Sequence, residues 1–165
     1  MAVIVKDDFL DDLFRDIDTL VKSKVMVGIP DAAAASRQPE EGEGAPPSNA
    51  LIGYLMEFGS PDIHLPARPT LIPGIEKVQD KITDRLRRAA VAAISGDSSG
   101  LEANLMAAGI IAQSSVRAEI TDGTFTPLAE RTIKARLRRG KTSDKPLIDS
   151  GQFRQAITYV VKRGS

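Results

Sequence analysis

The most constraining part of this sequence is the segment 49–75, which reads NALIGYLMEFGSPDIHLPARPTLIPGI. Apolar residues at helical spacing in its first third predict a short helix, with Asn49 as the N-cap. Gly59 can adopt the left-handed conformation that ends a helix, and Pro61 prevents the helix from continuing. The segment therefore predicts a helix with a sharp end.

Prolines then frame an extended crossing into a second helix. Pro66 and Pro69 favour extended backbone in the residues that precede them. Thr70 can cap the helix that follows, and Pro73 falls within its first turn, where proline is tolerated. Apolar spacing continues this helix over residues 70–94. The whole segment is thus expected to form a rigid corner between two helices.

The remaining periodicity predicts an α+β fold in a single domain, residues 1–165. The chain has the length of one domain that can bury a core without staples. Further helices are predicted over residues 7–23, 101–119 and 126–138, and strands over residues 24–29 and 156–162. We expect the strands to form a small antiparallel sheet packed on one side by two or three long helices. The short link between helices 70–94 and 101–119 predicts that these two pack antiparallel.

Two segments between these elements are predicted to be loops. Residues 31–48, DAAAASRQPEEGEGAPPS, hold no large apolar side chain. A segment of this composition buries too little apolar surface to order itself, so we expect a flexible acidic loop that a partner could order. A second loop, rich in basic residues, is predicted over residues 139–146.

Charge is balanced over the whole chain but unevenly distributed along it. The formal net charge is zero, with 22 basic and 22 acidic residues. By count, residues 1–62 carry about seven excess acids and residues 63–165 about seven excess bases, a split that suggests charged partners.

The sequence contains no cysteine, which excludes disulfides and thiolate metal sites. No apolar run approaches the ~20 residues of a membrane span. We expect a soluble protein made in the cytoplasm, with no membrane contact.

The acidic start of the first helix has two interpretations. Asp7, Asp8, Asp11 and Asp12 lie in its first turns, where the helix dipole favours negative charge. Such a cluster could bind a divalent cation, but a solvated helix face supported by the dipole is the interpretation that we favour. No metal site is predicted here.

The sequence offers no constellation for catalysis. His64 is the only histidine and lies between two apolar residues, without a nucleophile-elbow sequence or further ligands at metal spacing. The stretch Gly-Lys-Thr-Ser that begins at Gly140 resembles a phosphate-binding loop only superficially, because Ala135 stands where the first glycine is needed. We therefore predict no enzyme activity and no cofactor.

A run of cations over residues 131–145 is the strongest electrostatic feature. Its side chains could contact nucleic-acid phosphates or an acidic protein surface, with a strength that falls as salt rises. The run lacks the interleaved aromatic residues that often stack on bases. Three interpretations stay open: a solvated helix face, an acidic protein partner, and direct DNA contact.

Two groups of motifs together resemble a family of tailed-bacteriophage proteins. The first runs from Ile52 through Glu57-Phe58-Gly59-Ser60 to Leu65-Pro66-Ala67-Arg68-Pro69, and the second runs from Leu128-Ala129 through Lys145-Pro146-Leu147 to Phe153 and Tyr159. The family comprises tail-component, tail-completion and head–tail joining proteins of lambdoid-type phages and prophages. Order and spacing agree over residues 20–162. Leu65, Thr70 and Ile72 depart from the family pattern, which has isoleucine, an aromatic residue and arginine there.

This resemblance implies a structural virion protein that works by contact rather than by turnover. Such a protein is assembled in the host cytoplasm as a homo-oligomeric ring at the head–tail interface or tail end, beside connector and tail proteins, where it could also lie near phage DNA. Tail termination or a neck-adaptor role is the alternative within this class. A DNA-contacting module that uses the basic run is the alternative outside it. The candidate residues for protein contact are Glu57, Pro66, Arg68, Pro69, Arg136, Arg138, Arg139 and Lys141.

Overall fold

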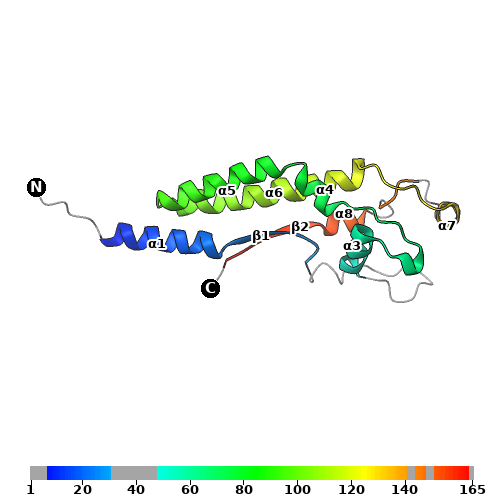
Figure 1. Ribbon diagram of the computed structural model, residues 1–165, viewed down its shortest axis with the longest axis horizontal. Helices are drawn as coiled ribbons and strands as arrows, with labels where there is room; N and C mark the ends of the chain where they lie inside the picture. The colour runs from blue at the N-terminus through cyan, green and yellow to red at the C-terminus, as the bar shows by residue number, and fades with distance from the viewer. Residues whose placement is uncertain (1–6, 31–47, 141–143, 148–150, 164–165) are drawn as a thin grey trace, which may run out of the picture. The chain divides into compact units, whose positions relative to one another are not determined.

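The computed structural model describes residues 7–30, 48–140, 144–147 and 151–163 (Figure 1). The flexible loop predicted over residues 31–48 lies outside this part of the chain except for Ser48, as does Lys141. The chain divides into two compact units. The first comprises Met1–Val27, Val78–Ala112 and Tyr159–Ser165, and the second comprises Gly28–Lys77 and Gln113–Thr158. The expectation of one folding domain stays a prediction.

The predicted α+β class is confirmed. The protein is mostly helical, with one small antiparallel sheet of two strands. The strands are β1 (Lys24–Gly28) and β2 (Thr158–Lys162), which lie where the alternating apolar pattern predicted them. The first unit adds three helices: α1 (Asp7–Lys22), α5 (Gln79–Ile94) and the first part of α6 (Ser98–Asp122).

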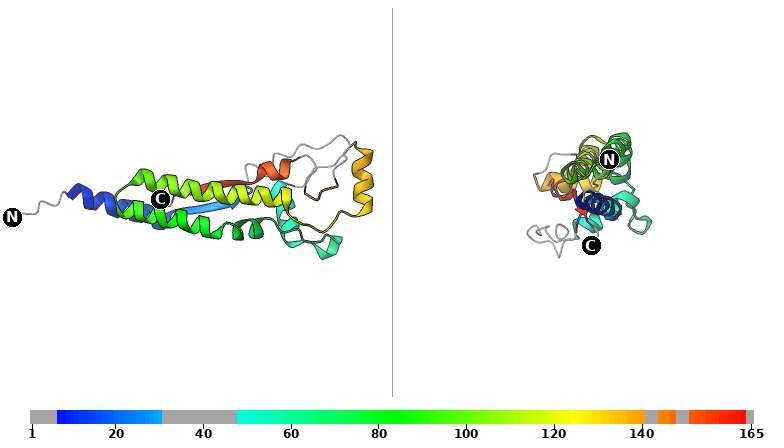
Figure 2. Two further views of the ribbon diagram at one scale, coloured as in Figure 1. Left: turned by 90° about the horizontal axis from the view of Figure 1, so that it is seen from above. Right: turned by 90° about the vertical axis from the view of Figure 1, so that its left-hand side faces the viewer.

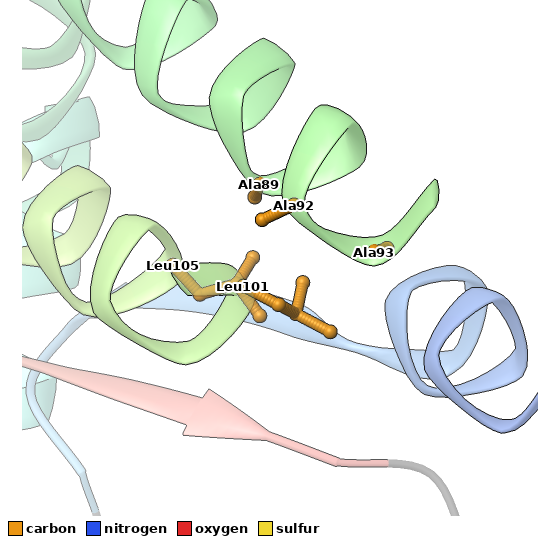
Figure 3. Close-up of a cluster of buried hydrophobic side chains, with 5 residues drawn as sticks. All are labelled: Ala89, Ala92, Ala93, Leu101 and Leu105. Atoms are coloured by element: carbon orange, nitrogen blue, oxygen red, sulfur yellow. The ribbon is translucent and has the colours of Figure 1, made fainter. Parts of the chain in front are cut away.

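Small side chains build the core of the first unit. Ala89, Ala92 and Ala93 of α5 meet Leu101 and Leu105 of α6, and all five are buried (Figure 3). The short link between α5 and α6 sets them side by side, as Figures 1 and 2 show. Partly buried side chains from α1 and from both strands pack against this cluster: Leu20, Val25 and Val161. The helices therefore cover one face of the sheet, as expected.

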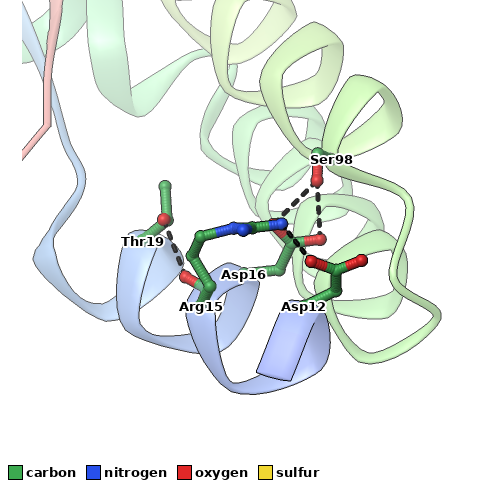
Figure 4. Close-up of polar contacts among 5 residues, drawn as sticks. All are labelled: Asp12, Arg15, Asp16, Thr19 and Ser98. Carbon is green, nitrogen blue, oxygen red and sulfur yellow. Dashed lines mark hydrogen bonds and ion pairs between the residues drawn. The ribbon is translucent and has the colours of Figure 1, made fainter. Parts of the chain in front are cut away.

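A buried carboxylate connects α1 to the start of α6. Asp16 is buried, and both of its oxygens accept from the Ser98 hydroxyl at 2.8 Å (Figure 4). Ser98 begins α6, so the carboxylate lies where the helix dipole favours negative charge. Nearby on α1, Asp12 forms an ion pair with Arg15. Across the described residues, no three acidic or histidine side chains gather as a metal site requires.

The second unit contains the corner predicted from the sequence. Its elements are α3 (Asn49–Phe58), the 3₁₀ turn η1 (Pro61–Ile63), α4 (Leu71–Glu76), the second part of α6, α7 (Glu130–Arg138) and α8 (Gln152–Ala156). Helix α3 contacts α8. Gly74 of α4 lies so close to α6 that an added Cβ would fall 2.8 Å from the Val116 Cα.

Three predicted helix boundaries are wrong. The helix predicted over residues 70–94 is two helices, because Val78 has non-helical backbone (φ −123°, ψ 15°) at the start of α5. The apolar spacing continues across this break and gives no sign of it. The cap of α3 is Ser48, whose hydroxyl accepts from the Leu51 amide at 3.2 Å, and Asn49 is the first helical residue. Helix α7 begins at Glu130 rather than near Pro127.

The close approach of α6 to β2 predicts that replacing Gly109 by alanine destabilises the protein. A Cβ at Gly109 would lie 2.3 Å from Cδ2 of Tyr159. We expect Gly109→Ala to lower the free energy of unfolding by about 1–3 kcal/mol, although alanine favours helix. Urea denaturation followed by circular dichroism measures the change. Gly53→Ala in α3 is the matched control, because its Cβ would meet the flexible end of Ile29 at 3.2 Å. Equal effects of the two substitutions would contradict this packing.

Candidate functional site

A carboxylate on α3 caps the next helix of the corner. Glu57 accepts from the backbone amides of Thr70 at 2.7 Å, Leu71 at 2.9 Å and Ile72 at 2.9 Å. These amides begin α4 and have no partner within the helix. Thr70 holds the N-cap position but makes no side-chain cap bond. Glu57 therefore supplies the cap that the sequence assigned to Thr70, and it fixes the angle between α3 and α4.

Gly59 lets the chain turn tightly enough for Glu57 to reach α4. Its φ of +73° favours glycine, and an added Cβ would lie 2.8 Å from the Ala67 amide nitrogen. Ser60 and Leu65 then exchange two backbone hydrogen bonds of 2.9 Å around the η1 turn. His64 ends that turn in a left-handed conformation (φ 53°) and is exposed. The predicted sharp end of α3 is thus confirmed, together with its cause.

Arg68 ties the corner to a segment almost 60 residues later. Its backbone amide donates to the Met56 carbonyl at 2.6 Å. Its side-chain Nε donates to the Thr126 carbonyl at 2.9 Å, and Nη2 donates to the Pro127 carbonyl at 3.1 Å. The side chain is buried, with 5% of its surface exposed. The Thr126 and Pro127 carbonyls, which the sequence placed at the start of a helix, instead accept from Arg68, and α7 begins later, at Glu130.

A pocket of about 490 Å³ lies against these contacts within the second unit. Its volume falls within the ~300–1,000 Å³ of typical ligand pockets. Apolar side chains from α3, from the corner and from the C-terminal motif segment form most of its wall: Ile52, Met56, Leu65, Pro66, Leu128, Leu147 and Phe153. The polar part of the wall includes Asn49, Arg68, Arg131, Thr132, Arg136 and Gln152.

Positive charge is concentrated at this pocket. Arg136 is buried, with 7% of its surface exposed, and its Nη1 donates to the Lys145 carbonyl at 2.9 Å. Burial, and then the positive charge of Arg136, lower the pKa of the Arg68 guanidinium. Arginine nevertheless stays charged at neutral pH. Arg131 also lines the pocket, and it is exposed.

The basic run predicted from the sequence does not form one face. Arg131, Lys134, Arg138 and Arg139 of the run are exposed, whereas Arg136 is buried. Lys134 lies 3.6 Å from Glu130 in an exposed ion pair. Arg136 thus differs in its surroundings from its neighbours in the run, a difference that the sequence pattern did not indicate.

The candidate contact residues therefore separate into two classes. Arg68, Arg136 and Glu57 make contacts inside the second unit, whereas Pro66, Pro69, Arg138 and Arg139 are exposed. Their contacts with other proteins stay predictions, and Lys141 lies outside the described residues.

None of the described helices is long and apolar enough to cross a membrane. No protein family, curated protein or solved structure matches this chain.

The capping role of Glu57 predicts a specific loss of stability. Glu57→Ala removes the acceptor for three amides, so we expect the free energy of unfolding to fall by about 1–3 kcal/mol. Glu76→Ala is the matched control, because Glu76 is exposed on α4 and its loss is expected to change stability by less than about 0.5 kcal/mol. Urea denaturation compares the two variants. Equal losses would mean that the Glu57 cap does not hold the corner.

Arg68 is predicted to stabilise the second unit. Arg68→Met keeps much of the apolar stem but removes two charge-assisted donors, and we expect a loss of about 2–4 kcal/mol in unfolding free energy. Arg138→Met, on the exposed side of α7, serves as the control and should leave the melting temperature nearly unchanged. An Arg68→Met variant as stable as the Arg138→Met variant would show that the two bonds to the carbonyls contribute little.

Proposed function

We propose that this chain is a structural phage virion protein that acts in tail completion or head–tail joining. In this role it forms a homo-oligomeric ring and docks to neighbouring connector and tail proteins in the virion. Tail termination and a neck-adaptor role belong to the same class of function and stay open as alternatives. The protein acts by shape and contact, without turnover of a substrate.

The observation that carries this proposal is the meeting of the two motif groups in one place. The group at residues 52–69 and the group at residues 128–153 are far apart in the sequence, yet side chains from both line the same pocket. Arg68 of the first group donates to Thr126 and Pro127, directly before the second. Described residues from both motif groups thus meet within the second unit, although Tyr159, at the end of the second group, belongs to the first unit.

Individual motif residues also have clear physical roles within that unit. Glu57 caps α4, Gly59 permits the turn, and Arg68 fixes the corner. Each role needs that residue type at that position, so these motif matches reflect the geometry of the unit. This supports a likeness in fold between the chain and the phage family, and through it the proposed role.

DNA contact is the less favoured function. It rests on the exposed cations of α7, which could approach phosphates. However, Arg136 is buried and Lys134 lies beside Glu130, which leaves fewer cations available on that helix. Salt-sensitive binding of duplex DNA by the purified protein, lost when Arg138 and Arg139 are replaced by alanine, would favour this alternative.

A deletion experiment tests the proposed function. Deleting the gene from the phage or prophage that encodes the chain should yield separate heads and tails, or tails of aberrant length, in negative-stain electron microscopy. Plasmid-borne wild-type protein should restore intact particles and raise infectious titre. Glu76→Ala, an exposed substitution in α4, should restore them equally. Normal particles in the deletion strain would overturn the proposal.

A further inference from the structure

The pocket of the second unit presents an unused hydrogen-bond donor. Among the described residues, Nη1 of Arg68 has no hydrogen-bond partner, whereas Nε and Nη2 both donate to carbonyls. No described buried side-chain nitrogen or oxygen lacks a partner, so Nη1 must retain some accessible surface. Arg68 is otherwise buried and is one of the residues that line the pocket.

The chemistry of the pocket defines what would fill it. Apolar walls favour a large apolar side chain, and a charged donor in the wall favours a carboxylate beside it. Arg131 also lines the pocket and is exposed. It carries no ion pair within the described residues, so its positive charge would attract an acidic segment toward the pocket. The suitable occupant is therefore a segment that presents large apolar side chains flanked by acidic ones.

One helix of this same chain has that character. On α1, Phe14 and Val21 are 66% and 76% exposed, and Leu10 is exposed on the same side. These residues are spaced at i, i+4 and i+11, so they form one stripe. Asp11 and Asp18 lie along one side of this stripe and are also exposed, and Asp18 forms an ion pair with Lys22 at 2.9 Å. The stripe is separate from the side of α1 that carries Asp16 and Leu20 toward α5 and α6.

We propose that the α1 stripe of one copy (Leu10, Phe14 and Val21) docks in the Arg68 pocket of a second copy. The contact joins two different surfaces, so it is heterologous and can be repeated from copy to copy around a ring. Acidic α1 and the basic pocket have opposite charge, which steers the encounter and sets its direction. This inference deepens the proposed function and rests on it for the ring.

Photo-crosslinking of the purified full-length chain tests the contact. A benzophenone amino acid at position 14 should give dimers and longer chains after irradiation. Mass spectrometry should then map the crosslinks to pocket residues, Met56 above all. Arg131→Glu should reduce the yield at least ~5-fold, because it places a like charge against the acidic stripe. The same probe at position 91, an apolar position on α5 of similar exposure, is the control and should not reach the pocket.

A mixing experiment establishes the heterologous geometry. Phe14→Asp disables the stripe and Arg131→Glu weakens the pocket, and both positions are exposed, so both variants should fold. Each variant alone should stay monomeric in native mass spectrometry. An equimolar mixture should form a one-to-one complex that grows no further, since one intact stripe meets one intact pocket.

Three results would overturn the proposal. These are a wild-type chain that stays monomeric and uncrosslinked at its highest soluble concentration, crosslinks that map to another surface such as the exposed face of α3, and a yield unaffected by Arg131→Glu. All three are measured without other phage proteins. If they occur while the deletion strain still fails to join heads to tails, this contact is wrong and the proposed function stands.

Discussion

The second unit depends on the side chain of Arg68. Its guanidinium links the corner after α3 to the extended segment before α7, across 58 residues of sequence. Charge-assisted hydrogen bonds to carbonyls are among the stronger polar contacts in proteins, at roughly 1.5–3 kcal/mol each. With Glu57 fixing α4 on one side and Arg68 fixing the α7 approach on the other, the position of the pocket is set by two ionic side chains. The pocket wall is then completed by apolar residues that these contacts bring together.

In the first unit, close packing of small apolar side chains builds the core. Its core is built from alanines and leucines of α5 and α6, so the two helices can approach closely. Large apolar side chains are meanwhile exposed on several helices, among them Phe14, Leu51, Tyr54, Phe58, Val91, Ile94 and Ile110. Where exposed apolar side chains form a contiguous patch, the patch is typical of a surface that binds other proteins. Exposed apolar side chains on helices of both units are compatible with the contact role that we propose.

Sequence periodicity predicted most elements of the fold but few of the contacts between them. The helix over residues 7–23, both strands and the sharp end at Gly59 follow from local rules of apolar spacing, capping and backbone sterics, and all are confirmed. The break at Val78 was missed because the apolar spacing runs through it. Local rules also suggested Thr70 as the cap of α4, whereas the acceptor comes from Glu57, 13 residues earlier.

The candidate site was harder to predict because its key contacts are long-range. Arg68 was a candidate for protein contact because it belongs to a motif of the resemblance, whereas in the structure it is buried and donates to carbonyls at residues 126 and 127. Arg136 looks like any other cation in a basic run, and only the folded chain sets it apart. The sole available signal was indirect: two motif groups that resemble one family in the same order, which indicates that they meet in space.

We propose that this chain occupies a joint of a phage particle as a ring. Cryo-electron microscopy of purified particles, with mass spectrometry of their protein content, is the sharpest test of this role. We expect the chain in intact particles, and we expect a ring of density at the head–tail interface or tail end that fits its two units. Intact, infectious particles that lack the chain would show that it has no such role.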